Sequence, residues 1–300
     1  TFIVVALTFT AMAGFVVWSR LGGRRHVATE KRPLILVPAT EDPPVANHSK
    51  IEHDHGHLHV ASNGIPKHQV GRFPNQGNPN SIRPQSYNFE LPESPKPAEK
   101  VTSIYHTSRF GPPNMPFGIA VNGILFDPGT AEFWQGDRGS GWNYEALGGA
   151  VPLGIDENFA HVQPQGAYHY HGIPDQLLKE LGVDSTKHSP LVGWAADGYP
   201  LYSVFAYADP EDPKSEIVPL RSSFRLKEGD RPGSKNGPSG KHDGTFVQDY
   251  EYVAGSGDLD ECNGRFCKTP EFPAGTYAYF LTNEWPVIPR AFRGMPVKLR

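Results

Sequence analysis

The residues best suited to chemistry lie in the stretch QPQGAYHYHGIP, residues 163–174, where Tyr168, His169, Tyr170 and His171 alternate. In an extended strand, successive side chains point to opposite faces, and residues two apart share a face about 7 Å along the strand. Two imidazoles on one face can converge on one ion, and neutral imidazole suits copper, zinc, iron or nickel. We therefore predict that the two histidines are metal ligands and that the two tyrosines pack their rings on the other face.

A metal site needs at least a third ligand. His161 lies eight residues before His169, across the segment VQPQGA, whose proline and glycine can turn the chain back. His188 and His242 are the alternatives, the first after a predicted helix and the second in a glycine-rich loop. We rank His161 first. The competing interpretation is a half-buried strand whose histidines bind no metal and hydrogen bond to carboxylates or waters.

A second histidine-rich segment, IEHDHGHLHV, occupies residues 51–60, with His48 nearby. Its histidines recur at every second position: His53, His55, His57 and His59. Short tracts of this composition are typical of metal binding. The polar setting and Gly56 indicate a flexible segment, so we predict low-affinity metal capture rather than catalysis. The alternatives are a solvated linker and a pH-responsive charge cluster.

Carboxylates provide a second set of candidate site residues. Asp197 in ADGYP, and Asp258, Asp260 and Glu261 in GDLDEC, could serve a metal enzyme as ligand or base. Asp197 followed by glycine is also what a tight turn requires. The acidic run lacks the spacing of an EF-hand. The chain has no G-x-S-x-G, Walker A or H-E-x-x-H motif.

The chain has two cysteines, Cys262 and Cys267, in the segment DECNGRFC. The Asn-Gly pair between them is a turn signal. In an exported domain, cysteines spaced in this way are expected to form a disulfide. The alternative is two unrelated thiols.

Composition excludes some classes of partner. The 300 residues carry a formal net charge of −4, and no basic stripe indicates a nucleic-acid partner. The sequence points to no particular protein partner. The 32 glycines and 30 prolines predict a chain rich in turns.

The N-terminal residues 2–18, FIVVALTFTAMAGFVVW, carry no charge and are mostly apolar. Their length is near the lower limit for a helix that spans a bilayer. They predict a transmembrane anchor, or a signal segment cleaved after AMA. A buried core helix is the remaining alternative. With an anchor or a signal segment, the domain would be exported to the periplasm or the cell exterior. It would be membrane-anchored in the first case and secreted in the second.

Three regions follow from these patterns. Residues 1–18 form the anchor or signal segment, residues 19–61 a linker with the histidine tract, and residues 62–300 one domain. The fold class expected for this domain is mainly β, a single β-sandwich-like domain with short helical insertions.

Four segments support the mainly β assignment. Residues 117–126 predict a hairpin around Asn-Gly. Residues 190–208 predict two strands separated by Asp-Gly, and residues 275–282 predict an aromatic strand. Residues 174–182 predict one helix, with proline at its start and glycine at its end.

Several of these motifs occur in an order that resembles the YHYH domain family. They are SNGIPKHQVGRFPNQGNPNSI, MPFGIAVNGILFDPGTAEFW, AHVQPQGAYHYHGIP, LVGWAADGYPLY, LDECNGRF, TPEFPAGTYAYFLT and PVIPRAFRG. The resemblance spans residues 62 to 298. It implies one exported folded unit with residues 168–171 as its signature, and it implies no reaction. Ala278 and Ala291 depart from the family pattern, which often has a histidine and a cysteine at these positions.

Three hypotheses for function follow. The first is an exported domain that binds a transition metal, with copper first and zinc next, since imidazole sites follow the Irving–Williams order. The second is an exported metal-dependent hydrolase or oxidoreductase. The third is a structural or adhesive surface domain without metal.

Overall fold

The computed structural model describes residues 33–105, 114–233, 235 and 237–300. The predicted anchor at residues 2–18 lies outside these residues. Within them, no helix has both the length and the apolar character that crossing a membrane requires.

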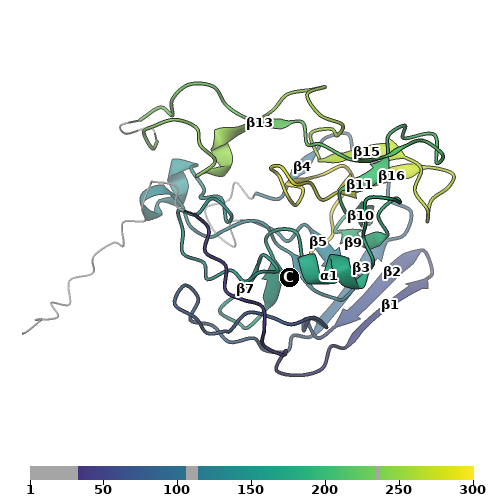
Figure 1. The fold of residues 1–300 in the computed structure, drawn as a ribbon, viewed down its shortest axis with the longest axis horizontal. Coiled ribbons are helices and arrows are strands. Elements are labelled where there is room, and N and C mark those ends of the chain that lie inside the picture. The colour runs from purple at the N-terminus through teal and green to yellow at the C-terminus, as the bar shows by residue number, and fades with distance from the viewer. Residues whose placement is uncertain (1–32, 106–113, 234, 236) are drawn as a thin grey trace, which may run out of the picture.

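The largest element is an eight-stranded mixed sheet with the strand order β15-β16-β10-β9-β5-β6-β8-β7 (Figure 1). Its strands are β5 (Gly118–Ala120), β6 (Leu125–Phe126), β7 (Ala160–Val162), β8 (Tyr168–Tyr170), β9 (Leu191–Ala195), β10 (Pro200–Tyr202), β15 (Gly264–Cys267) and β16 (Thr276–Phe280). β7 is an edge strand, and its neighbour β8 carries the Tyr-His-Tyr-His segment.

The remaining strands form smaller sheets. Three antiparallel strands pair in the order β1-β2-β3, and three further sheets have two strands each. The bounds are β1 (Ser49–Asp54), β2 (His57–Ser62), β3 (Tyr87–Pro92), β4 (Thr102–Ser103), β11 (Phe205–Tyr207), β12 (Ile217–Pro219), β13 (Phe224–Leu226), β14 (Tyr250–Tyr252) and β17 (Ala291–Phe292). Among the described residues, the helices are α1 (Asp175–Glu180) and the short 3-10 helices η1 (Trp134–Gly136), η2 (Arg138–Ser140) and η4 (Val247–Asp249). The prediction of a mainly β chain is confirmed, and the finer sandwich-like arrangement stays a prediction.

The hairpin predicted at residues 117–126 is formed by β5 and β6. Its turn requires glycine for two reasons. Gly123 has a φ of 82°, which side chains rarely adopt, and a Cβ there would lie 2.1 Å from Ser62 Oγ. The turn therefore joins the large sheet closely to β2.

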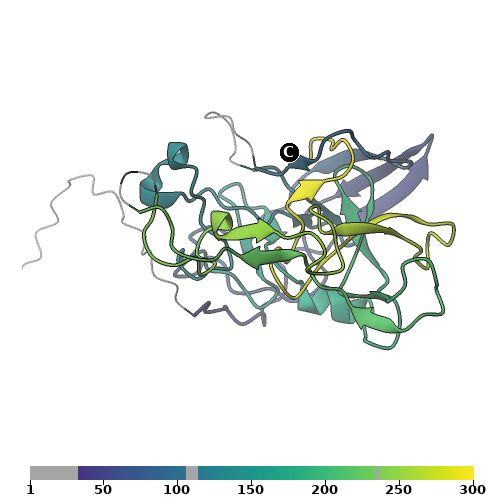
Figure 2. The same ribbon diagram turned by 90° about the horizontal axis from the view of Figure 1, so that it is seen from above.

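One hydrophobic core lies between the three-stranded sheet and the large sheet. Leu58, Val60 and Leu91 of the small sheet belong to the same buried cluster as Ile119 and Tyr168 of the large sheet. Figure 2 shows β1 and β2 at the opposite end of the molecule from η1 and η2.

The histidine tract is part of this folded unit, which contradicts its prediction as a flexible linker. Residues 49–54 and 57–62 pair as an antiparallel hairpin. His55 and Gly56 at its tip have φ values of 48° and 81°. Positive φ at both central residues is the conformation that a tight hairpin turn favours. The linker prediction failed because Leu58 and Val60, between the histidines, are core residues.

The predicted disulfide is also absent. Cys262 and Cys267 are both free and buried. Cys262 packs in the cluster shared by the two sheets, whereas Cys267 packs in a separate cluster with Tyr202 and Phe280. Cys267 is the last residue of the extended strand β15, which begins at Gly264. The two thiols are therefore packed in two different hydrophobic clusters.

The hairpin assignment makes a specific prediction about stability. Leu58→Ala should lower the free energy of unfolding by about 2–5 kcal/mol, because it leaves a cavity under β2. The neighbouring exposed residue gives the control, since His57→Ala should change it by less than about 0.5 kcal/mol. Urea unfolding of both variants measures this, and equal small effects would contradict the packing of the tract.

Candidate metal centre

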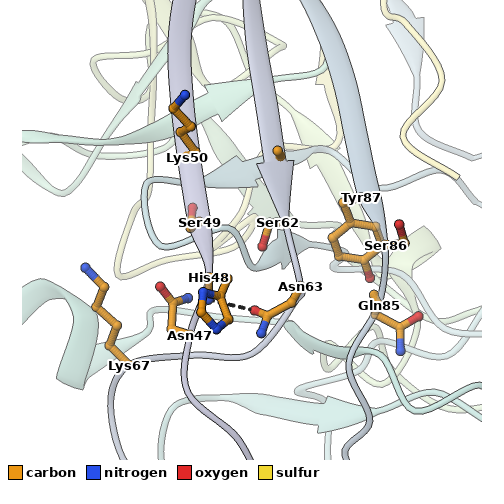
Figure 3. A pocket seen from close by; sticks show the side chains of 11 residues that line it. Asn47, His48, Ser49, Lys50, Ser62, Asn63, Lys67, Gln85, Ser86 and Tyr87 are labelled. Atoms are coloured by element: carbon orange, nitrogen blue, oxygen red, sulfur yellow. Dashed lines mark hydrogen bonds between the residues drawn. The ribbon is translucent and has the colours of Figure 1, made fainter.

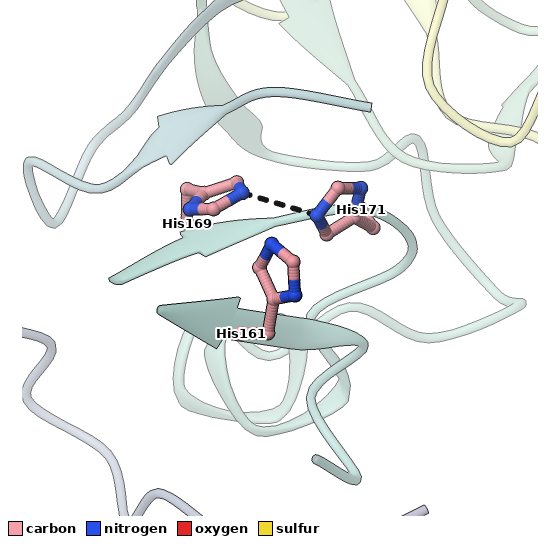
Figure 4. A group of neighbouring side chains, drawn as sticks. All are labelled: His161, His169 and His171. Carbon is pink, nitrogen blue, oxygen red and sulfur yellow. Dashed lines mark hydrogen bonds between the residues drawn. The ribbon is translucent and has the colours of Figure 1, made fainter. Parts of the chain in front are cut away.

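Three histidines converge on one face of the sheet. His161 on β7 is paired directly with His169 on β8, and His171 follows two residues later. One ligand nitrogen from each ring lies within 4.8 Å of the other two (Figure 4). The ring centroids are 4.5–4.7 Å apart. The predicted trio is therefore brought together, with His161 rather than His188 or His242 as the third member.

Backbone carbonyls determine which nitrogens are available. His169 Nδ1 lies 3.1 Å from the Ala167 carbonyl, and His161 Nδ1 lies 3.1 Å from the Leu153 carbonyl. A carbonyl only accepts, so each Nδ1 carries the proton and each Nε2 keeps its lone pair. A carbonyl partner on one ring nitrogen is also typical of histidines whose other nitrogen binds a metal.

The Nε2 atoms of His169 and His171 lie so close that a proton or a metal ion must lie between them. Their Nε2 atoms are 3.0 Å apart. His171 Nδ1 has no partner with hydrogen-bond geometry, although the Pro128 carbonyl lies near enough to raise the pKa of this ring slightly. Without a metal, His171 Nε2 must carry a proton and donate it to His169. With a metal, both lone pairs can point at the ion.

Burial keeps these rings neutral. His169 and His171 are 2% and 1% exposed, and His161 is partly buried. Desolvation lowers the pKa of His161 to about 3 and that of His169 to about 4, and lowers the pKa of His171 well below its usual value. Neutral imidazole is the form that binds a metal, so the site is ready for an ion at pH 7.

The tyrosines explain the other half of the alternation. Tyr168 donates to Asp156 Oδ2 at 2.7 Å on the opposite face of β8. The hydroxyl of Tyr170 lies 2.7 Å from His68 Nε2 and accepts from Asn122 Nδ2 at 2.9 Å. Both rings are fully buried, and both hydroxyls have partners, as buried tyrosines require.

Asp127 is a site residue that the sequence analysis missed. It follows β6, which is parallel to β8, and its backbone N–H donates to the Tyr170 carbonyl. Asp127 Oδ2 accepts from Arg300 Nη1 at 2.7 Å and from Gln163 Nε2 at 2.9 Å. Asp127 Oδ1 is buried and has no hydrogen-bond partner. Burial raises the pKa of Asp127, and Arg300 opposes this.

A second buried ion pair lies beyond Pro128. Arg290 Nη1 donates to the Pro128 carbonyl at 2.7 Å, and Arg290 Nη2 donates to both carboxylate oxygens of Glu145 at 3.0 and 3.2 Å. Trp285 Nε1 also donates to Glu145, at 2.9 Å. This pair fixes the Pro128 segment beside His171 and leaves Glu145 no free oxygen.

The histidines of the β1–β2 hairpin do not form a comparable cluster in the part of the chain that the structure describes. His53 lies 2.8 Å from Glu93, and His55 lies 2.6 Å from Asp54. His57 and His59 share the solvent-facing side of β2, with ring centroids 6.2 Å apart. Metal binding by His53, His55, His57 and His59 therefore stays a prediction.

The candidate carboxylates hold loops in place. Asp197 Oδ2 accepts from the Tyr279 hydroxyl at 2.5 Å and from the Gly294 N–H at 2.8 Å, next to a turn at Gly198. Asp260 accepts from the Tyr277 hydroxyl at 2.9 Å. Asp197 thus has the turn role that the sequence analysis kept as its alternative.

The remaining acidic candidates are at the surface or serve the backbone. Asp258 Oδ2 accepts from the Arg221 N–H at 2.7 Å, and Glu261 is exposed. His188 is buried between the rings of Tyr202 and Tyr207.

A polar hollow of about 550 Å³ opens over β1 and β2 (Figure 3). Asn47 in its lining donates to the Ile65 and Asn122 carbonyls, and Asn63 accepts from the His48 N–H. These amides already tie the strands to neighbouring loops. None of the three converging histidines lines this hollow.

The fold and the site together define a mainly β protein with a cluster of three histidines, two of which belong to the Tyr-His-Tyr-His segment. The sequence model of the family described as YHYH protein matches residues 88–294. The chain belongs to this family. No curated protein and no solved structure matches it.

The lowered pKa values predict an acid-sensitive fold. An unfolded histidine takes up a proton near pH 6.5, whereas buried His161 resists protonation down to about pH 3. The unfolded state thus binds more protons between these values, so the stability of the metal-free protein should fall as the pH drops from 7 to 5.

Comparison with His161→Gln isolates the contribution of this ring. The variant should lose up to about 1.4 kcal/mol less stability per pH unit than the wild type, because one titrating group is gone. Urea unfolding in the presence of a chelator at several pH values measures the slopes. Equal slopes would show that His161 is protonated in the folded state.

Proposed function

We propose that the protein binds one transition-metal ion through the Nε2 atoms of His161, His169 and His171. The observation that carries the proposal is the 3.0 Å approach of His169 Nε2 to His171 Nε2, with His161 Nε2 completing the group. Two of the three rings have their Nδ1 protons bonded to backbone carbonyls, which leaves Nε2 for the ion.

The spacing suits a small ion. A metal bound tetrahedrally at 2.0–2.1 Å separates its ligand nitrogens by about 3.3 Å. Copper is our first candidate and zinc the second, since both accept imidazole and copper(II) binds more strongly in the Irving–Williams order.

Burial supports metal retention as the main role. His169 and His171 are almost inaccessible, and only His161 is partly exposed. A site enclosed in this way favours holding an ion over rapid exchange of substrate. A metal-dependent hydrolase or oxidoreductase is the second candidate, because three protein ligands leave a position open, as in catalytic zinc sites.

The cellular setting is part of the proposal. The apolar residues 2–18 support an exported protein, membrane-anchored or secreted, whose domain is periplasmic or extracellular. The histidine hairpin would then meet metal ions from the surroundings and capture them with low affinity before transfer to the buried site.

The first experiment measures metal binding by the purified protein. The wild type should bind one equivalent of copper or zinc tightly, and 100 Kd of free metal should raise its stability by about 2.7 kcal/mol. His169→Ala and His171→Ala should each weaken binding by about 100-fold or more, which corresponds to ~2.7 kcal/mol of binding free energy.

His188→Ala is the matched control, because His188 is also buried but lies outside the cluster. It should retain the tight site. Elemental analysis and competition with a chromophoric chelator measure content and affinity. Unchanged binding in both ligand variants would refute the proposed centre.

The hairpin histidines have a separate test. Replacing His53, His55, His57 and His59 with alanine should remove weak additional binding and leave the tight equivalent unchanged. Calorimetric titration resolves the two classes. The low-affinity role fails if the weak class persists in this variant.

A further inference from the structure

We propose that Asp127 is the carboxylate of the metal centre, where its Oδ1 accepts a hydrogen bond from a water at the fourth coordination position. The proposal rests on the metal site proposed above. It adds a residue of another type, which directly follows strand β6, and it specifies what occupies the fourth position.

The register of the sheet places Asp127 on the histidine face. Leu125 is paired with His169, and Phe126 is paired with Tyr170. Continuing this parallel register by one residue brings Asp127 beside His171. Because alternate residues share a face, Asp127 and His171 lie on the same side, and Phe126 and Tyr170 lie on the other.

The free oxygen of Asp127 is the second observation. Asp127 is 2% exposed, and its Oδ2 is used by Arg300 and Gln163. Its Oδ1 has no partner, although a buried carboxylate oxygen normally has one. A water bound to the ion would donate the missing hydrogen bond.

The other buried carboxylate near the site has no oxygen to spare. Glu145, the carboxylate beyond Pro128, gives both oxygens to Arg290. Asp127 interacts electrostatically with His161 and keeps one oxygen available.

A water, rather than Asp127 itself, fits the fourth position. Ligand atoms around a tetrahedral ion lie about 3.3 Å apart. The group of atoms that lie within 4.8 Å of one another contains the three histidines and does not include Asp127. Asp127 thus acts through the water and is a positioning residue.

Cobalt(II) provides the test, because its visible spectrum reports on the ligands of a zinc-like site. The experiment uses the full chain as wild type, Asp127→Asn and Asp156→Asn. Asp127→Asn should weaken Co²⁺ binding by about 10–100-fold, the usual cost of losing such a partner, and should change the visible bands. Asp156 is the matched control, because it is equally buried but bonds to Tyr168 on the opposite face.

Asp156→Asn should leave the affinity and the spectrum of the folded protein at wild-type values. Circular dichroism establishes that each variant is folded. Wild-type affinity or an unchanged spectrum in Asp127→Asn would overturn the role of Asp127, as would a direct metal–carboxylate bond in X-ray absorption spectra of the wild type. A wild type that binds no Co²⁺ at the histidines would instead refute the metal centre itself.

Discussion

Strand β8 is buried on both faces, and this constraint shapes everything around it. Its residues 168–170 and the following His171 are all polar or have polar tips, yet each is almost inaccessible to water. Burying such groups costs free energy unless each finds a partner. The tyrosines meet this requirement with Asp156, His68 and Asn122. On the histidine face, His171 Nδ1 has no hydrogen-bond partner within the protein.

The late strand β16 shows what the same pattern does without histidine. Tyr277 and Tyr279 point to the shared core and bond to Asp260 and Asp197, much as the tyrosines of β8 bond to their partners. The residue between them is Ala278, which packs on the other face in an apolar cluster with Phe280. The tyrosine face is therefore a structural element used twice, whereas the histidine face on β8 is specific to the site.

Patterns of adjacent residues predicted the secondary-structure elements well, but they did not predict which strands pair over long distances in the sequence. The Asn-Gly hairpin, the short helix and the alternation in residues 168–171 were each predicted from adjacent residues and are confirmed. His161 could also be predicted from the sequence, because only a short turn separates it from β8. Asp127 was not, since its place beside His171 depends on β6 pairing with a strand more than forty residues later. The histidine hairpin was predicted as a linker for the same reason. Its strand β2 pairs with β3, which begins only at Tyr87, and adjacent residues do not reveal this pairing.

The position of β7 determines how an ion could reach the site. β8 lies between β6 and β7, and its His169 and the following His171 are almost inaccessible to water. β7 is an edge strand, and its His161 is the one histidine of the cluster that is partly exposed. An ion would therefore meet His161 first and pass to His169 and His171 once the edge strand yields. Since edge strands open at lower free energy than central ones, the rate of metal exchange would follow local opening of β7 rather than global unfolding.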